Sequence, residues 1–272
     1  MRGRRKKRYR IRPGCFPLLV LVVILFLATV LFLKPESRSV AVEDPAGEES
    51  GIGFQSRLEE YAGEEGIPLS EWPEELIETA EKNPETEEFV LHYPQKKAMR
   101  QPIDLNAYRN TEEVPLFLQW DERWGYREYA GEVMGISGCG PTCLSMVSVY
   151  LLHNPKYNPR FVAEFSTKRG YFVNGKGSRW TLMTEGAEAL GLKAYPIGLD
   201  ESVIRDQLEN HHPIICAMSP GHFTTTGHFI VLTDYQDGMI KVNDPFSRKR
   251  SDRRWHYSEI SDQISGMWAY SV

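Results

Sequence analysis

The spacing of apolar residues predicts helices followed by an antiparallel sheet in the C-terminal part of the chain. Four segments carry apolar residues at helical spacing: 141–152, 159–169, 182–190 and 201–208. After Pro213 the period changes, and four segments have the pattern of strands: 214–218, 228–235, 239–243 and 266–272. Helices that precede a run of strands are typical of an α+β fold, which we predict for residues 114–272.

A hairpin turn relates two of these strands and two polar residues at their ends. Asp237–Gly238 is a favoured two-residue turn, and it separates the strands that begin at His228 and end at Asn243. Counting back from the turn, Tyr235 pairs with Gly238 or its neighbour. This register places Asp244 near the residues around His228.

The N-terminal apolar run predicts a membrane anchor. Residues 15–33 form 19 positions without a charge, about 28 Å as a helix, which is close to the thickness of the hydrocarbon core of a bilayer. Residues 2–12 carry eight positive charges, so residues 1–14 should stay cytoplasmic and Lys34 onward should lie outside the cell membrane. A cleaved signal peptide is the alternative, but residues 31–33 are bulky where a small-residue cleavage site would stand.

Two further segments separate the predicted anchor from the C-terminal domain. Residues 34–53 hold few large apolar groups and read as a flexible acidic tether. Residues 54–113 predict a small helical pre-domain, with helices that start near Phe54, Pro73 and Thr86. An autoinhibitory or substrate-binding role for this pre-domain stays open.

Composition and charge exclude several classes of protein. The 272 residues are 41% hydrophobic and 25% charged, which excludes a wholly disordered or multi-spanning chain. Residues 35–113 hold 20 acids and 7 bases, and residues 114–272 hold 17 acids and 16 bases. No basic face remains beyond the N-terminal tip, so we expect no nucleic-acid partner. No CxxC or Cys/His cluster suggests zinc, and we expect no cofactor.

Cys139 is the first candidate for chemistry. It lies in the string Gly138–Cys139–Gly140–Pro141, directly before a helix that we expect to start with Pro141 at its first position. A thiol there faces the positive end of the helix, which favours the thiolate. The two glycines would leave room for a substrate backbone beside the sulfur.

A thiolate nucleophile needs a base, and His228 provides one. It opens an apolar run that reads as a central strand, so its imidazole can face a helix start at the edge of the sheet. Asp244 follows the partner strand, where a carboxylate can orient the imidazole. The order Cys139, His228, Asp244 therefore predicts a nucleophilic enzyme with a Cys-His-Asp triad.

Several strings together resemble the peptidase family thirty-nine-like group of bacterial papain-type cysteine peptidases. They are GCGPTCLSM, the GHFIVLTDY run, VNDPF, LQWDERWGY, GSRWTLMTEGAEALGL and NPETEEFVLHYP, within residues 72–272. The resemblance implies a papain-like fold, with Cys139 as nucleophile, His228 as base and acid, and Asp244 as orienting carboxylate. It offers Gln119 as an oxyanion-hole donor beside the backbone N–H of Cys139. Gln119 lies 20 residues before Cys139, where a shorter gap is usual, so a structural role stays open.

Other reactive or aromatic residues have competing interpretations. We expect Cys143 and Cys216 to be buried, and His222 to lie in a substrate loop if it is not the base. We expect three tryptophans to lie in the core or in the wall of the cleft: Trp120, Trp124 and Trp180. We expect two basic runs to lie on a solvated edge of the hairpin: Arg248–Arg250 and Arg253–Arg254.

Together these features predict a membrane-anchored, outward-facing cysteine peptidase that hydrolyses peptide bonds in a peptide or protein substrate. The lipid bilayer would bind residues 15–33. Two alternatives stay open: a catalytically silent cell-surface binding module of the same fold, and a peptidoglycan amidase or acyl-transferase with the same triad.

Overall fold

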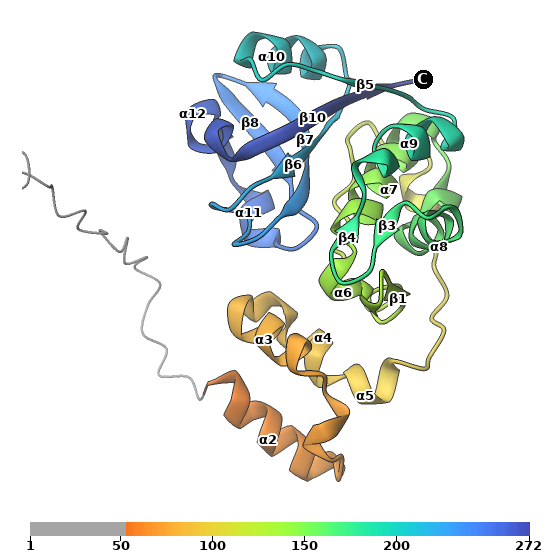
Figure 1. The fold of residues 1–272 in the computed structure, drawn as a ribbon, viewed down its shortest axis with the longest axis vertical. Coiled ribbons are helices and arrows are strands. Elements are labelled where there is room, and N and C mark those ends of the chain that lie inside the picture. The colour runs from red at the N-terminus through yellow and green to blue at the C-terminus, as the bar shows by residue number, and fades with distance from the viewer. Residues whose placement is uncertain (1–52) are drawn as a thin grey trace, which may run out of the picture. The chain divides into compact units, whose positions relative to one another are not determined.

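Six antiparallel strands form the main sheet of the computed structural model, which describes residues 53–272 (Figure 1). Their order across the sheet is β5-β10-β6-β7-β8-β9. The strands are β5 Lys193–Pro196, β6 Ile214–Met218, β7 His228–Gln236, β8 Met239–Asn243, β9 Arg254–His256 and β10 Ile264–Ser271. The helices that precede β6 and the antiparallel pairing after it confirm the predicted α+β class.

Both faces of the central strands are covered. Every residue of β6 is buried, because alternate side chains enter two different cores. Ala217 and its neighbour Phe229 face the core that contains helix α7, whereas Cys216 and Ile230 face the core that contains helix α10. The helices of this part are α6 Met134–Ser137, α7 Cys139–Leu152, α8 Pro159–Arg169, α9 Glu185–Leu190, α10 Glu201–Glu209, α11 Arg248–Asp252 and α12 Tyr257–Ile260.

Two short hairpins and one shortened helix complete the helical side. The hairpins are β1 Glu128–Tyr129 with β2 Glu132–Val133, and β3 Phe172–Val173 with β4 Gly177–Ser178. The helix predicted over 182–190 is wrong at its start, because a 3-10 turn at Trp180–Leu182 precedes α9. Gly191 ends α9 in the left-handed conformation, which glycine adopts without strain.

The hairpin of β7 and β8 differs slightly from the predicted register. The first pair after the Asp237–Gly238 turn is Gln236 with Met239, not Tyr235 with Gly238. A bulge between Leu232 and Asp234 then shifts the register by one residue, so that Val231 pairs with Asn243. Extended by one position, this register sets Asp244 opposite Ile230. Without the bulge, Asp244 would stand opposite Val231, one residue further from His228.

The pre-domain consists of four helices with a small core of their own. These are α2 Phe54–Glu65, α3 Glu74–Lys82, α4 Glu87–Leu91 and α5 Tyr93–Lys96. Leu58, Leu76 and Val90 are fully buried between them. Tyr126 joins this core from the C-terminal part, where its ring stacks on Phe89 at 4.4 Å between centroids. The pre-domain helices thus pack directly on the domain that follows them.

Within residues 53–272, no helix has the length and apolar character required to cross a bilayer. The predicted anchor at 15–33, the basic tip at 1–14 and nearly all of the tether at 34–53 lie outside the described residues.

Candidate active site

Three different elements bring Cys139, His228 and Asp244 together. Cys139 is the first residue of α7, His228 is the first residue of β7, and Asp244 directly follows β8. Helix α7 therefore begins two residues earlier than predicted, and Pro141 is its third residue rather than its first. Helix α7 packs against β7, and the first residues of both elements line the same pocket.

The imidazole of His228 lies between the other two side chains. Its Nε2 is 2.8 Å from Oδ1 of Asp244, and Cys139 lines the same pocket, close enough to raise the pKa of His228. Since Nε2 faces the carboxylate, Nδ1 is the ring atom left for the sulfur. Asp244 is fully buried, and Cys139 is only partly buried. The arrangement holds the ring in one orientation and leaves the sulfur accessible.

The charges of the site favour a protonated imidazole. Burial alone would lower the pKa of His228, but the Asp244 carboxylate and the Cys139 sulfur outweigh it and raise this pKa to about 9. Burial likewise acts to raise the pKa of Asp244, and the positive charges of His228 and Arg250 overcome it and lower this pKa. Near neutral pH the pair is therefore an imidazolium beside a carboxylate.

Asp244 accepts hydrogen bonds on both of its oxygens. Oδ1 accepts from His228 and from the backbone N–H of Phe246 at 2.8 Å, and Oδ2 accepts from Nε of Arg250 at 2.5 Å. The expectation that Arg248–Arg250 forms only a solvated edge is wrong for Arg250. The sequence signal for this contact is a short spacing, because Arg250 follows Asp244 by six residues across the turn that leads into α11.

The side-chain amide of Gln119 is bonded to backbone carbonyls. Its side chain is 1% exposed, and its Nε2 donates to the carbonyls of Gly135 and Ile136, both at 2.8 Å. Both amide protons are thus engaged by the segment that leads into α7. The expectation of an oxyanion donor is not met, and the alternative, a structural role for Gln119, fits these contacts.

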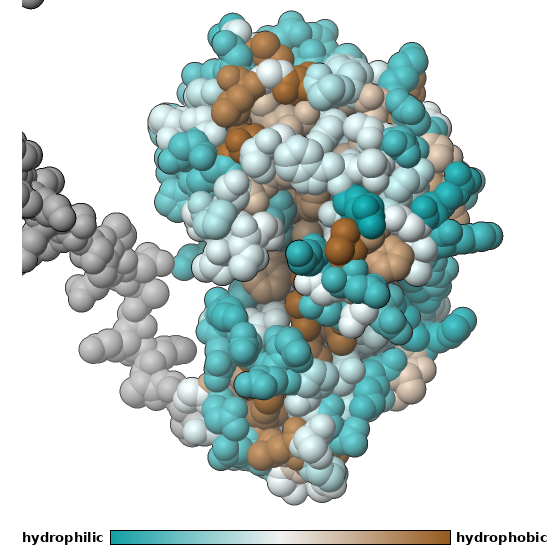
Figure 2. Space-filling model, in the orientation of Figure 1, coloured by the Kyte–Doolittle hydropathy of each residue, from teal (hydrophilic) through white to brown (hydrophobic). Residues whose placement is uncertain are grey.

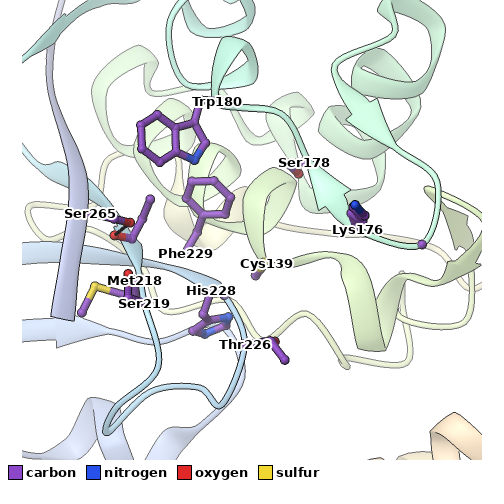
Figure 3. Close-up of a pocket in the computed structure, with 13 residues that line it drawn as sticks. Cys139, Lys176, Ser178, Trp180, Met218, Ser219, Thr226, His228, Phe229 and Ser265 are labelled. Carbon is purple, nitrogen blue, oxygen red and sulfur yellow. Dashed lines mark hydrogen bonds between the residues drawn. The ribbon is translucent and has the colours of Figure 1, made fainter.

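Cys139 and His228 open onto a pocket of about 530 Å³ (Figure 3). In Figure 3 Cys139 comes from the helical side and His228 from the sheet side. The other lining residues come from the β3–β4 hairpin, the 3-10 turn, the sheet and the loop before β7: Gly175, Lys176, Ser178, Trp180, Ala217, Met218, Ser219, Thr226, Gly227, Phe229 and Ser265. The pocket contains one lysine and no carboxylate. It is thus an open groove beside the sulfur and not a sealed core.

Trp180 is the large exposed apolar side chain of this pocket. It is 51% exposed, and its ring packs edge-on against Trp268 at 5.2 Å. On the face shown in Figure 2, polar side chains separate the apolar surface into small patches. Among the described residues, exposed large apolar side chains are few, and Trp180 combines such exposure with a place beside Cys139. Of the three tryptophans weighed from sequence, this one lines the groove.

The competing candidates lie elsewhere. His222 packs 5.4 Å from the ring of Trp255 and lines a different pocket. Cys143 and Cys216 are fully buried as predicted, and burial raises the pKa of both thiols. In the part of the chain from residue 53 onward, no group of three histidine, cysteine or acidic side chains could hold a metal ion.

Gly140 lies tightly against the β3–β4 hairpin, so packing alone requires a glycine here. A Cβ at this position would lie 2.2 Å from Oγ of Ser178 on β4.

We expect Gly140→Ala to lower the free energy of unfolding by about 2 kcal/mol, because the start of helix α7 must move away from the β3–β4 hairpin. Urea unfolding measures this change. Gly198→Ala, with nothing within 4 Å of its Cβ, is the control and should change stability by less than about 0.5 kcal/mol. Equal stabilities of the two variants would contradict the close contact.

Comparison with known proteins identifies the class of this domain. The sequence model of the Peptidase_C39-like family matches residues 111–271. This match spans more than half of the chain, and the chain belongs to that family.

Two solved structures are similar in fold. One is the peptidase domain of Streptococcus ComA, a bifunctional ABC transporter involved in a quorum-sensing pathway; it has 18% identity, a TM-score of 0.40, and coverage of 50% of this chain and 91% of that chain. The other is a C39-like peptidase, titled putative, from Bacillus anthracis, with 14% identity, a TM-score of 0.38, and coverage of 58% and 94%. No curated protein matches the chain.

Proposed function

We propose that the chain is a membrane-anchored cysteine peptidase that cleaves peptide bonds with Cys139, His228 and Asp244. The observation that carries the proposal is the position of His228, whose Nε2 is 2.8 Å from the buried Asp244 carboxylate and which shares a pocket with the partly buried Cys139. A structural histidine would need neither the exposed sulfur nor the open pocket. Membership of the Peptidase_C39-like family supports the same chemistry.

The reaction follows from these positions. The thiolate of Cys139 attacks the carbonyl carbon of the peptide, and a carbon–sulfur bond forms. The imidazolium of His228 gives its Nδ1 proton to the leaving amine as the carbon–nitrogen bond breaks. Nδ1 then takes a proton from water, whose oxygen attacks the thioester. The acid product leaves, and the thiolate and imidazolium are restored.

Beyond the sulfur and the imidazole, three groups contribute: one at the reacting carbonyl, one at a substrate side chain and one at His228. The backbone N–H of Cys139, at the start of α7, is our proposed donor to the developing oxyanion, since the first N–H groups of a helix have no acceptor within it. Trp180 offers an apolar ring at the pocket for a substrate side chain. Asp244 stabilises the imidazolium without taking its proton.

We propose that the catalytic domain acts on the outer face of the cell membrane. The basis is the charge-free run at 15–33 preceded by eight positive charges at 2–12. Cysteine accessibility to a membrane-impermeant thiol reagent in intact cells tests this orientation, because labelling of Cys139 only after lysis would place the domain inside.

Site-resolved alkylation tests the thiolate. With the full-length protein and iodoacetamide, we expect the alkylation rate of Cys139 at pH 6 to stay within about tenfold of its rate at pH 10, whereas an ordinary thiol slows more than about 100-fold. Peptide mass spectrometry separates the cysteines, and the buried Cys143 and Cys216 should stay unmodified. A Cys139 that alkylates at pH 6 no faster than an ordinary thiol would favour a silent binding module.

Product analysis separates hydrolysis from transfer. In water labelled with oxygen-18, a peptidase releases a free amine and an acid that carries one labelled oxygen. A new amide without label would indicate an acyl-transferase, and cleavage confined to peptidoglycan stem peptides would indicate an amidase.

A further inference from the structure

The pre-domain is bonded to the segment that follows Asp244. Glu85 accepts three hydrogen bonds from it: from Oγ of Ser247 at 2.5 Å, from the backbone N–H of Arg248 at 2.7 Å and from that of Lys249 at 3.3 Å. Asn83 donates from Nδ2 to the carbonyl of Phe246 at 2.7 Å. These contacts join residues more than 160 positions apart in the sequence.

The bonded segment is the start of helix α11. Ser247 is its N-cap and accepts from the backbone N–H of Arg250. The carboxylate of Glu85 binds the N–H groups of the first turn, which have no acceptor within the helix, and its charge suits the positive helix end. A helix of five residues has little stability of its own, so an external cap decides whether it forms.

Helix α11 in turn holds Asp244. Arg250 donates from Nε to Oδ2 at 2.5 Å, and the hydroxyl of Ser251 accepts from the backbone N–H of Asp244 at 2.9 Å. The chain of contacts therefore runs from Glu85 through α11 to the carboxylate, and from the carboxylate to His228.

We propose that Glu85 of the pre-domain is a positioning residue for the active site. It caps helix α11 and thereby fixes Asp244 against His228. Glu85 lies outside the region that the family model matches, which begins at residue 111. The inference rests on the proposed function, since it assigns the pre-domain a part in the same triad. It gives that segment a catalytic purpose beyond covering apolar surface.

The position of Glu85 separates this effect from substrate binding. Glu85, Ser247 and Arg250 line a pocket of about 530 Å³ that shares no lining residue with the pocket at Cys139. Loss of Glu85 should thus alter the state of the Cys139–His228 pair and leave the substrate groove unchanged.

Alkylation of the full-length protein by iodoacetamide tests the proposal. In Glu85→Ala the carboxylate of Asp244 is held less firmly and stabilises the imidazolium less, so we expect the alkylation rate of Cys139 at pH 6 to fall about fivefold. At pH 10 the rates of Glu85→Ala and wild type should be equal. Glu85→Gln keeps the shape and one acceptor oxygen, and should give a smaller loss. Glu81→Ala, an exposed glutamate of α3, is the matched control and should behave as wild type.

The buried cysteines report whether a variant is folded. Cys143 and Cys216 are fully buried, so their alkylation marks unfolding. If the buried cysteines of Glu85→Ala become alkylated, the test of the positioning role is made with Glu85→Gln instead. A folded Glu85 variant with a wild-type rate at pH 6 overturns the positioning role and leaves the proposed function intact. Wild-type protein with an ordinary thiol profile overturns both. A selective loss at pH 6, with both buried cysteines protected, supports the positioning role.

Discussion

Replacing Cys139 by alanine is expected to lower kcat for peptide hydrolysis by at least about 10⁴-fold, because the bond-forming atom is lost and the rest of the site cannot replace it. The fold should persist, since Cys139 is only partly buried. The measurement is hydrolysis of the quenched fluorescent peptide that the wild-type protein cleaves fastest from a library. Full activity in Cys139→Ala would end the nucleophile assignment.

Cys143→Ala is the matched control for this loss. Cys143 lies one helical turn further along α7, is fully buried, and donates from its thiol to the carbonyl of Phe229 at 3.3 Å. We expect a loss of about 1 kcal/mol in the free energy of unfolding and a kcat within about threefold of wild type. A loss as large as that of Cys139→Ala would show that the helix start, not the sulfur, carries the effect.

The approach of Asp244 to His228 could be predicted because it depends on a local rule. A hairpin turn fixes the pairing of two strands, and so the approach of Asp244 to His228 follows from counting residues. The bulge between Leu232 and Asp234 could not be foreseen, since no residue in it requires one. The first turn of α7 was misplaced because Pro141 suits several positions in a helix start.

The surroundings of the triad could not be predicted because they depend on contacts between distant segments. The sequence indicates that Arg250 belongs to a solvated basic run, but in the structure helix α11 directs its side chain to Asp244. In the sequence, Glu85 is one of many acidic residues, but α3 and the turn that follows this helix place Glu85 beside Ser247. Gln119 was assigned from a resemblance, and its amide instead supports the backbone before α7. In each case the residue type was known, and its partner was set by packing.

Removing the carboxylate of Asp244 is expected to affect both stability and catalysis. In Asp244→Ala, His228 and Arg250 lose their shared buried partner, and we expect the free energy of unfolding at pH 7 to fall by about 3 kcal/mol. The loss of imidazolium stabilisation should lower kcat by about 10³-fold. The surface pair of Asp234, on β7, with Arg254 is the control: Asp234→Asn should cost less than about 1 kcal/mol. Equal costs for the two pairs would contradict the role of burial.

The isosteric variant Asp244→Asn separates charge from shape. Its oxygen can still accept from His228 and Phe246, but without the negative charge the pKa of His228 should fall from about 9 toward its ordinary value near 6.5.

The stabilisation that the wild-type protein gains from the raised pKa of His228 is fully present below about pH 6.5 and is lost as the pH rises through about 9. The stability difference between wild type and Asp244→Asn, measured by urea unfolding, should therefore be largest near pH 6 and shrink by pH 10. The alkaline limit of kcat/KM should move to lower pH in the variant for the same reason. A stability difference that stays constant from pH 6 to pH 10 would mean that Asp244 acts through its shape, and that His228 is not held as an imidazolium by its charge.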